Sequence, residues 1–216
     1  SSLEQLLLYF SLMKVNFPIT TTAYKEYCPA CHGEGSFKPG PDKGYICGTC
    51  EAHNDRLIII DPKLRWWLDD EKTYYHESVG ILIINSNQEI LFYELTKYPY
   101  GLTAPAGHVD EGEAAIDAII REAKEEVGIT LQTPKLILGC VIHGDQCRRG
   151  SDDHVWSLFT ARISDADTQQ IQLDAHEGKH PRWVTFDTIV SSRVPPAMRY
   201  LFETYSQKIA DAITQI

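Results

Sequence analysis

The 216-residue sequence has no apolar run long enough to cross a membrane. A transmembrane helix needs about 18–20 consecutive apolar residues, and polar residues interrupt every apolar stretch of this chain much sooner. The apolar segment near the N-terminus, residues 6–13, lacks both the basic leader and the small-residue cleavage site of a signal peptide. We therefore expect a cytoplasmic protein without membrane contact.

Basic residues are in deficit. The chain carries 20 Lys and Arg against 30 Asp and Glu, which gives a net charge of −10. Proteins grip nucleic-acid backbones with Lys and Arg, so this balance argues against a nucleic-acid partner and favours a small-molecule substrate. The 43% hydrophobic and 23% charged content is that of an ordinary globular protein.

The first segment has a helical pattern. Residues 3–14 are apolar at steps of three and four, at Leu3, Leu6, Leu7, Phe10 and Met13. We expect an N-terminal helix and linker over residues 1–26. The apolar face of this helix would pack on the body of the protein or on a second subunit in a homodimer.

Four of the six cysteines form two close pairs, Cys28-x2-Cys31 and Cys47-x2-Cys50. This spacing is typical of a tetrahedral structural Zn2+ site, in which each pair directs two thiolates at one metal. Residues 27–60 are rich in turn residues and too few to bury a sufficient core, so the metal would supply folding energy. The alternatives are disulfides, or replacement of one ligand by His32 or His53.

The rest of the chain, residues 61–216, mixes strands and helices without strict alternation. The pattern predicts strands at 78–84, 89–95, 136–143, 154–163 and 182–186, and a closing helix over 197–216. We expect an α+β fold, an α/β/α sandwich with a mixed sheet between helices.

One predicted helix carries a dense set of carboxylates. Its apolar stripe comprises Ile116, Ile119, Ile120, Ala123 and Val127. Glu122, Glu125 and Glu126 occupy a second face, where like charges repel one another. A hard cation such as Mg2+ removes this penalty because it prefers oxygen ligands. Gly128 follows the stripe and is expected to end the helix in a left-handed conformation.

The full motif is longer than this helix. It spans Gly107, Glu113, Arg121, Glu122, Ala123, Glu125, Glu126, Gly128 and Ile129. At these positions the sequence resembles the signature of the Nudix hydrolases. The resemblance covers about residues 75–216 and implies hydrolysis of a nucleoside diphosphate linked to another group, with Mg2+ or Mn2+ as cofactor.

The resemblance also implies roles for individual residues. Glu122, Glu125, Glu126 and the carbonyl of Ala106 would bind the catalytic cations. Arg121 would orient a glutamate, while Gly107, Glu113 and Gly128 would support the motif. A glutamate serves as the base in this family, and Glu177 on a later loop is our candidate, with His176 and His154 as alternatives.

Several residues are candidates for substrate contact. Arg148, Arg149 and His154 lie in or next to a loop between two predicted strands, where the arginines would grip a phosphate by paired hydrogen bonds. Tyr98, Tyr100 and Trp156 are candidates to stack on a base, although the sequence favours core packing for each of them.

A zinc knuckle before a Nudix domain is similar to the arrangement of NADH pyrophosphatases. The Ser-Gln-Pro-Trp-Pro-Phe-Pro-type segment that follows the motif in that group has no counterpart here. We therefore expect a substrate of the ADP-ribose, nucleotide-sugar or dinucleotide type without choosing among them. The alternatives are a ligand sensor that keeps the fold without catalysis and an RNA-end hydrolase.

Overall fold

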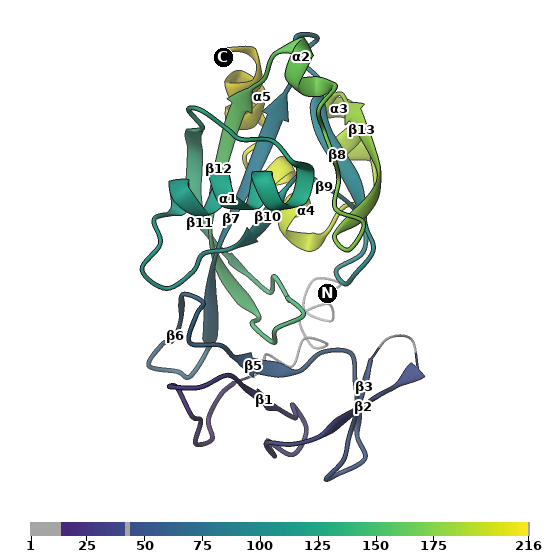
Figure 1. Cartoon of the computed structure of the whole chain (residues 1–216). Coiled ribbons are helices and arrows are strands. Elements are labelled where there is room, and N and C mark those ends of the chain that lie inside the picture. The colour runs from purple at the N-terminus through teal and green to yellow at the C-terminus, as the bar shows by residue number, and fades with distance from the viewer. Residues whose placement is uncertain (1–13, 42–43, 216) are drawn as a thin grey trace, which may run out of the picture. The chain divides into compact units, whose positions relative to one another are not determined.

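The computed structural model describes residues 14–41 and 44–215 (Figure 1). The helix predicted over residues 3–14 lies outside the described residues except for Lys14. The described chain divides into two compact units. The N-terminal unit contains the described residues up to His76 together with His143–His154, and the sandwich unit contains Glu77–Ile142 and the described residues from Val155 onward.

Short antiparallel strands build the N-terminal unit. Strand β1 (Lys25–Tyr27) pairs with β5 (Ile58–Ile60), and β2 (Phe37–Pro39), β3 (Tyr45–Cys47) and β4 (His53–Asn54) form a three-stranded sheet. Strand β6 (Trp66–Leu68) pairs with the first residues of β7 (Tyr74–Ile84). The buried apolar cluster of this unit is small: Val15, Tyr27, Ile58, Ile60 and Tyr74.

A later segment of the chain, His143–His154, completes this unit. The Ile59 N–H donates to the Arg149 carbonyl at 2.9 Å, and the Arg149 guanidinium lies 3.0 Å from the Asp61 carboxylate. Arg56 forms a buried ion pair with Asp152. The division into compact units differs from the domain boundary predicted between residues 60 and 61, which stays a prediction. Arg149 contacts both Ile59 of β5 and Asp61, and the Tyr74 hydroxyl donates to the Ile59 carbonyl at 2.6 Å.

The sandwich unit is built on one large sheet. Its strand order is β11 (Lys135–His143), β12 (Asp153–Arg162), β7, β8 (Ile90–Leu95) and β13 (Gly178–Val184). The short strand β10 (Ala106–His108) pairs with β7, and β9 (Leu102–Thr103) pairs with β8. Strands β7 and β8 pair antiparallel and are joined by a short turn.

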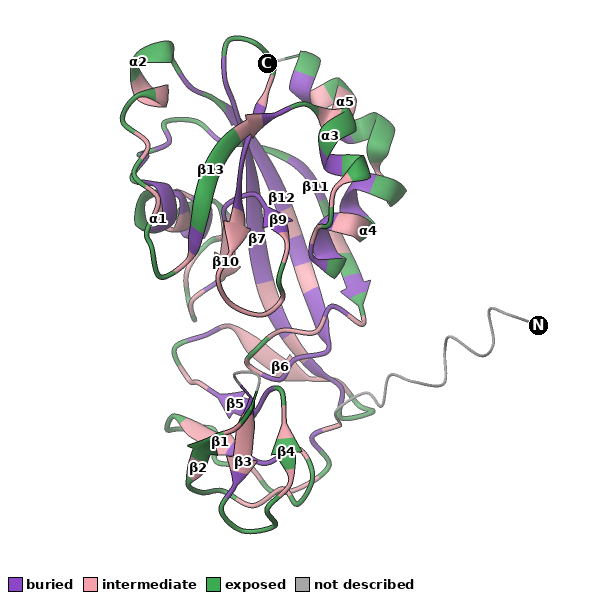
Figure 2. Cartoon of the chain, turned by 90° about the vertical axis from the view of Figure 1, so that its right-hand side faces the viewer, coloured by how far each residue is buried: buried purple, intermediate pink, exposed green. Residues whose placement is uncertain are grey.

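The sheet lies between two helical layers (Figure 2), and alternate residues of β7 and β8 belong to two different apolar clusters. Val79, Ile81 and Ile83 pack with the apolar stripe of helix α1 (Ala115–Val127). Leu82, Ile84 and Phe92 pack with helices α3 (Phe186–Ser191), α4 (Pro196–Thr204) and α5 (Ser206–Thr214). This two-residue period is that of a strand buried on both faces, and it confirms the predicted α/β/α sandwich.

The C-terminal part departs from the predicted elements. The single helix predicted over 197–216 is two helices that meet at Tyr205, which has φ −116° and ψ 27°. Strand β13 begins at Gly178 instead of Arg182, and its register shifts between Lys179 and Arg182. Helix α2 (Asp165–Thr168) is a single turn capped by Ser164, with no apolar face to predict it. No helix among the described residues is both long and apolar enough to cross a membrane.

Candidate active site

Helix α1 presents its three glutamates at very different depths. Glu126 is buried with 6% of its surface exposed, whereas the side chain of Glu122 is 14% exposed and that of Glu125 is 62% exposed. Gly128 ends the helix with φ 75°, the predicted left-handed conformation. The acidic face therefore runs from solvent into the protein within one turn.

Glu126 is held by donors from the sheet. The Tyr93 hydroxyl and the Ala106 N–H each donate to its Oε2 at 2.9 Å. Burial raises the pKa of Glu126 well above its usual range, and the nearby Glu122 carboxylate raises it further. A bound cation would offset both effects.

Glu122 lies against the backbone of Gly107. A Cβ at Gly107 would be only 2.1 Å from the Glu122 Cδ, so a side chain at this position would occupy the place of the carboxyl group. Burial raises the pKa of Glu122, and the hydrogen bond from Arg121 opposes that shift. The motif glycine thus leaves the space that the motif glutamate fills.

Arg121 connects the loop to the helix. Its Nε and Nη2 donate to the two oxygens of Glu113 at 3.0 and 2.8 Å, and its Nη1 donates to Glu122 at 2.7 Å. The same guanidinium donates to the His108 carbonyl at 3.1 Å. Glu113 also accepts the Asp110 N–H at 3.1 Å. This bidentate geometry fixes the Arg121 fork and orients Glu122.

Glu177 lies on a loop attached to both α1 and β8. The Asp174 N–H donates to the carbonyl of Glu126 at 2.8 Å, and the Thr96 N–H donates to the carbonyl of Glu177 at 3.2 Å. Lys97 Nζ is 2.7 Å from the Glu177 carboxylate. The Glu177 charge is among the causes that raise the pKa of Glu126. The loop therefore brings Glu177 within electrostatic range of the helix carboxylates, and its role as base stays a prediction.

The other substrate candidates lie in different surroundings. Arg148, Arg149 and His154 belong to the N-terminal unit, where Arg149 is paired with Asp61 and His154 is 2% exposed. Their role in substrate binding stays a prediction. Trp156 is buried, whereas Tyr100 is 40% exposed, so Tyr100 is the better placed of the two to stack on a base.

The chemistry of the α1 cluster fits a hard divalent cation. Carboxylate and carbonyl oxygens are the ligands that Mg2+ and Mn2+ prefer. Burial of the carboxyl groups raises the pKa values of Glu122 and Glu126, so a cation that replaces their protons stabilises both side chains. Glu122, Glu125, Glu126 and the carbonyl of Ala106 are the predicted ligands, and this role stays a prediction.

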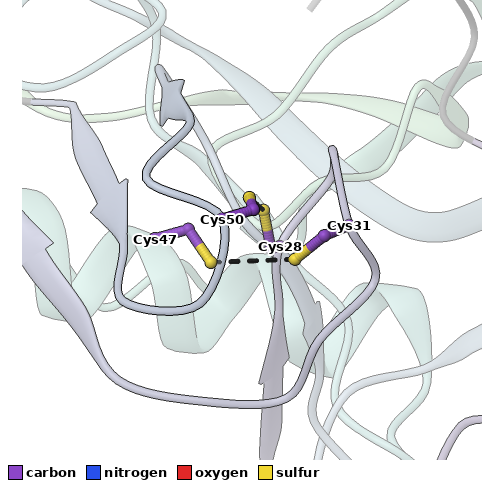
Figure 3. Close-up of side chains that lie close together, drawn as sticks. All are labelled: Cys28, Cys31, Cys47 and Cys50. Atoms are coloured by element: carbon purple, nitrogen blue, oxygen red, sulfur yellow. Dashed lines mark hydrogen bonds between the residues drawn. The ribbon is translucent and has the colours of Figure 1, made fainter.

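The four paired cysteines of the N-terminal unit form a second cluster (Figure 3). Their sulfurs lie within 4.8 Å of one another, with Cys28 and Cys50 at 3.7 Å and Cys31 and Cys47 at 3.8 Å. Disulfide sulfurs are about 2.05 Å apart, whereas the edge of a tetrahedron with metal–sulfur distances of about 2.3 Å is about 3.8 Å. The spacing is therefore that of a metal site and not of disulfides.

Backbone amides support these thiolates. The N–H groups of Cys50 and Thr49 lower the pKa of Cys47 to about 6, and the Ala30 N–H donates to the Cys28 sulfur at 3.4 Å. The two flanking histidines are engaged elsewhere. His32 stacks on Phe17, and His53 Nε2 lies 3.3 Å from the Pro41 carbonyl. The cluster is compatible with zinc held by four cysteines.

A comparison with protein families decides the identity of the sandwich unit. The model of the NUDIX domain matches residues 74–205. The chain belongs to the Nudix family. The match contains every motif residue described above and confirms the resemblance inferred from the sequence.

Nudix relatives share moderate identity with the chain. An RNA pyrophosphohydrolase of Wolbachia pipientis subsp. Culex pipiens is 28% identical over 138 residues, covering 58% of this chain and 83% of the relative. An RNA pyrophosphohydrolase of Ruthia magnifica subsp. Calyptogena magnifica is 36% identical over 58 residues, which is 27% of this chain and only 32% of the relative. The MutT protein of Methanosarcina mazei Go1 has a TM-score of 0.51 at 22% identity, over 62% of this chain and 95% of that structure, which shows a shared fold.

Tyr93 is a residue of the Nudix site that the sequence analysis did not identify. Tyr93 donates to Glu126 from β8, 33 positions away. Its position in an apolar strand suggests core packing, although a buried tyrosine hydroxyl needs a partner. That need was the only available signal, and it does not identify the acceptor.

Proposed function

We propose that the protein is a Mg2+- or Mn2+-dependent hydrolase. It cleaves a phosphoanhydride bond in a nucleoside diphosphate linked to another group, such as ADP-ribose, a nucleotide sugar or a dinucleotide. The observation that carries this proposal is the Glu126 carboxylate, buried beside Glu122 and held by Tyr93 and Ala106. Burying two like charges is costly, and a cation bound for catalysis explains why the cost is tolerated.

Each residue has a role in this proposal. The cation would be held by Glu122, Glu125, Glu126 and the Ala106 carbonyl, and when bound it neutralises charge on the diphosphate and acidifies a water. Arg121 keeps the Glu122 carboxylate in place through its bond of 2.7 Å. Tyr93 and the Ala106 N–H keep the Glu126 carboxylate in a single orientation.

Proton transfer falls to Glu177. A general base must lie within hydrogen-bond reach of the attacking water. The hydrogen bond from the Asp174 N–H to the Glu126 carbonyl, which holds the 174–178 loop at the end of α1, supports this assignment. Lys97 holds the carboxylate by an ion pair of 2.7 Å. Gly178 keeps the loop close to the sheet, because a Cβ there would be 2.2 Å from the Tyr93 ring.

A cavity of about 350 Å3 in the sandwich unit would take part of the substrate. Its walls include Tyr100, Lys179, Arg182 and Arg193, together with Glu94, which pairs with Arg182 at 3.2 Å. Lys179 is two residues from Glu177, so the cavity adjoins the loop that carries the base. This lining suits a ribose or base next to phosphate oxygens.

Zinc at the four cysteines is proposed to be structural. Its donors are all thiolates, as in closed structural sites, and the apolar cluster of this unit is small. Removal of the metal would therefore unfold the N-terminal unit without changing the carboxylate chemistry.

Hydrolysis of a substrate panel tests the proposal. The panel contains ADP-ribose, NADH, a nucleotide sugar, a dinucleoside polyphosphate, capped RNA and 5′-triphosphate RNA, each with Mg2+, Mn2+ or chelator. We expect metal-dependent turnover of a small nucleotide by the wild type and loss of turnover in Glu126→Gln. The matched control is Glu203→Gln on helix α4, an exposed glutamate on the opposite helical layer, which should retain full activity. Tight binding of a nucleotide without turnover would indicate a sensor and contradict the proposal.

RNA ends are the second candidate substrate. The observation that favours them is that relatives at 27–28% identity over 138 and 154 residues are named RNA pyrophosphohydrolases. The net charge of −10 weighs against long RNA contacts. Release of pyrophosphate from triphosphate RNA at a higher kcat/KM than any small nucleotide would replace the first candidate with this one.

A further inference from the structure

Three side chains with metal-ligating atoms meet inside the N-terminal unit. The ligand atoms of His76, Cys147 and His154 all lie within 4.8 Å of one another. His76 Nδ1 is 3.6 Å from the Cys147 sulfur, and the two histidine ring centroids are 5.5 Å apart. His76 and His154 are 0% and 2% exposed. This group is separate from the four paired cysteines.

A buried carboxylate supports one of the histidines. Asp145 is 6% exposed, and its Oδ2 lies 3.3 Å from His154 Nδ1. A carboxylate at one ring nitrogen of a metal-binding histidine fixes the tautomer and leaves the other nitrogen as the ligand. Asp145 lies near enough to His154 to take this supporting role when the metal is bound.

The backbone fixes Cys147 before any metal binds. The Cys147 N–H donates to the Ser151 carbonyl at 3.0 Å, and the Gly150 N–H donates to the Cys147 carbonyl at 3.1 Å. Gly150 has φ 89°, and a Cβ there would be 2.3 Å from the Leu57 carbonyl oxygen. The Ser151 hydroxyl donates to the Tyr74 carbonyl at 2.9 Å. The turn is therefore held against β5 and β7, with its thiol beside His76.

We propose that His76, Cys147 and His154 bind a second zinc ion. Imidazole and thiolate are the donors that Zn2+ prefers, whereas Mg2+ takes oxygen ligands. Two nitrogens and one sulfur supply three positions of a tetrahedron, and a water or a further side chain takes the fourth. His76 and Cys147 are 71 positions apart in the chain, so the ion cross-links the 143–154 segment to the start of β7.

Metal content of the full-length protein tests this site. We expect two zinc ions per chain in the wild type, and one in Cys147→Ser or His154→Ala. Cys140→Ser and His143→Ala are the matched controls, because Cys140 and His143 lie outside the three-residue group, and each should keep two ions. Cys31→Ser should lose the other ion. Replacement of zinc by Co2+ should give a thiolate-to-cobalt absorption that is reduced in Cys147→Ser and unchanged in Cys140→Ser.

A measurement on the wild type avoids variants that fail to fold. Zinc should protect Cys147 from alkylation, and a chelator should expose it, as read by mass spectrometry of the peptides. One zinc per chain in the wild type, or alkylation of Cys147 at the same rate with and without zinc, would overturn the proposal. Neither readout depends on hydrolase activity, so failure of this site and failure of the proposed function are distinguishable.

Discussion

Replacement of Gly107 by alanine should separate catalysis from stability. The new Cβ would lie 2.1 Å from the Glu122 Cδ, and an ordinary contact begins at 3.4 Å, so the carboxyl group must move by about 1.3 Å. Displacement of a catalytic group by about 1 Å can cost about 100-fold in rate, which corresponds to about 2.7 kcal/mol of transition-state stabilisation. We expect a fall of this size in kcat/KM and weaker binding of Mg2+.

Stability should change little in the same variant. Gly107 does not have a positive φ, and the atom that must move is the end of a side chain. Alanine also restricts the unfolded chain, which contributes about 0.4–1 kcal/mol to stability. We expect a free energy of unfolding within about 1 kcal/mol of the wild type, measured by urea denaturation with chelator present.

Two further variants test whether the loss of activity comes from displacement of the Glu122 carboxylate. Gly139→Ala is the matched control, because its Cβ meets nothing closer than 3.7 Å, and it should behave as the wild type does. In a Glu122→Ala background, Gly107→Ala should cause no further loss of activity, since the displaced group is absent. Wild-type kcat/KM in Gly107→Ala, or additive losses in the double variant, would refute the reasoning.

Three other predictions concern the same clusters. Glu126→Gln should raise the melting temperature of the metal-free protein, by about 2–4 °C for each kcal/mol gained in the free energy of unfolding. Burial and Glu122 raise the pKa of Glu126, so the stability that this carboxyl group contributes is present below the ordinary pKa of glutamate and is lost as pH rises. The gain in melting temperature measured by calorimetry should therefore grow between pH 4 and 8, and a gain that does not change with pH would contradict this. Arg121→Lys should lower the free energy of unfolding by about 1.5–3 kcal/mol, because lysine cannot make the bidentate contact with Glu113, and retention of full stability in urea denaturation would show that the fork is dispensable. Cys31→Ser should make the N-terminal unit sensitive to limited proteolysis at any zinc concentration, and zinc-dependent protection of this variant would argue against four-cysteine ligation.

The parts of the site that could be predicted are those encoded over short distances. Helix α1, its acidic face and the left-handed Gly128 follow from spacings of three to seven residues. Strands β7 and β8 follow from apolar runs, predicted at 78–84 and 89–95 and found at Tyr74–Ile84 and Ile90–Leu95. Local periodicity reports local geometry, so these elements were correctly placed.

Contacts between segments that are distant in the sequence could not be predicted from local periodicity. The hydrogen bond from Tyr93 to Glu126 and the ion pair of Arg56 with Asp152 join residues 33 and 96 positions apart. Strand β13 begins with the polar run from Gly178, whose extended form is set by pairing with β8 and not by its own side chains. The local pattern of a single sequence does not indicate which distant residues will be in contact.

The 143–154 segment limits how this protein can be divided. A truncation before residue 77 would remove Asp61, which pairs with Arg149, and Arg56, which pairs with Asp152. Asp152 is fully buried and would then be left as an uncompensated charge. The part of the chain before residue 77 therefore cannot be removed without destabilising the 143–154 segment. Engineering that grafts or deletes the cysteine-bearing part must also redesign the 143–154 segment.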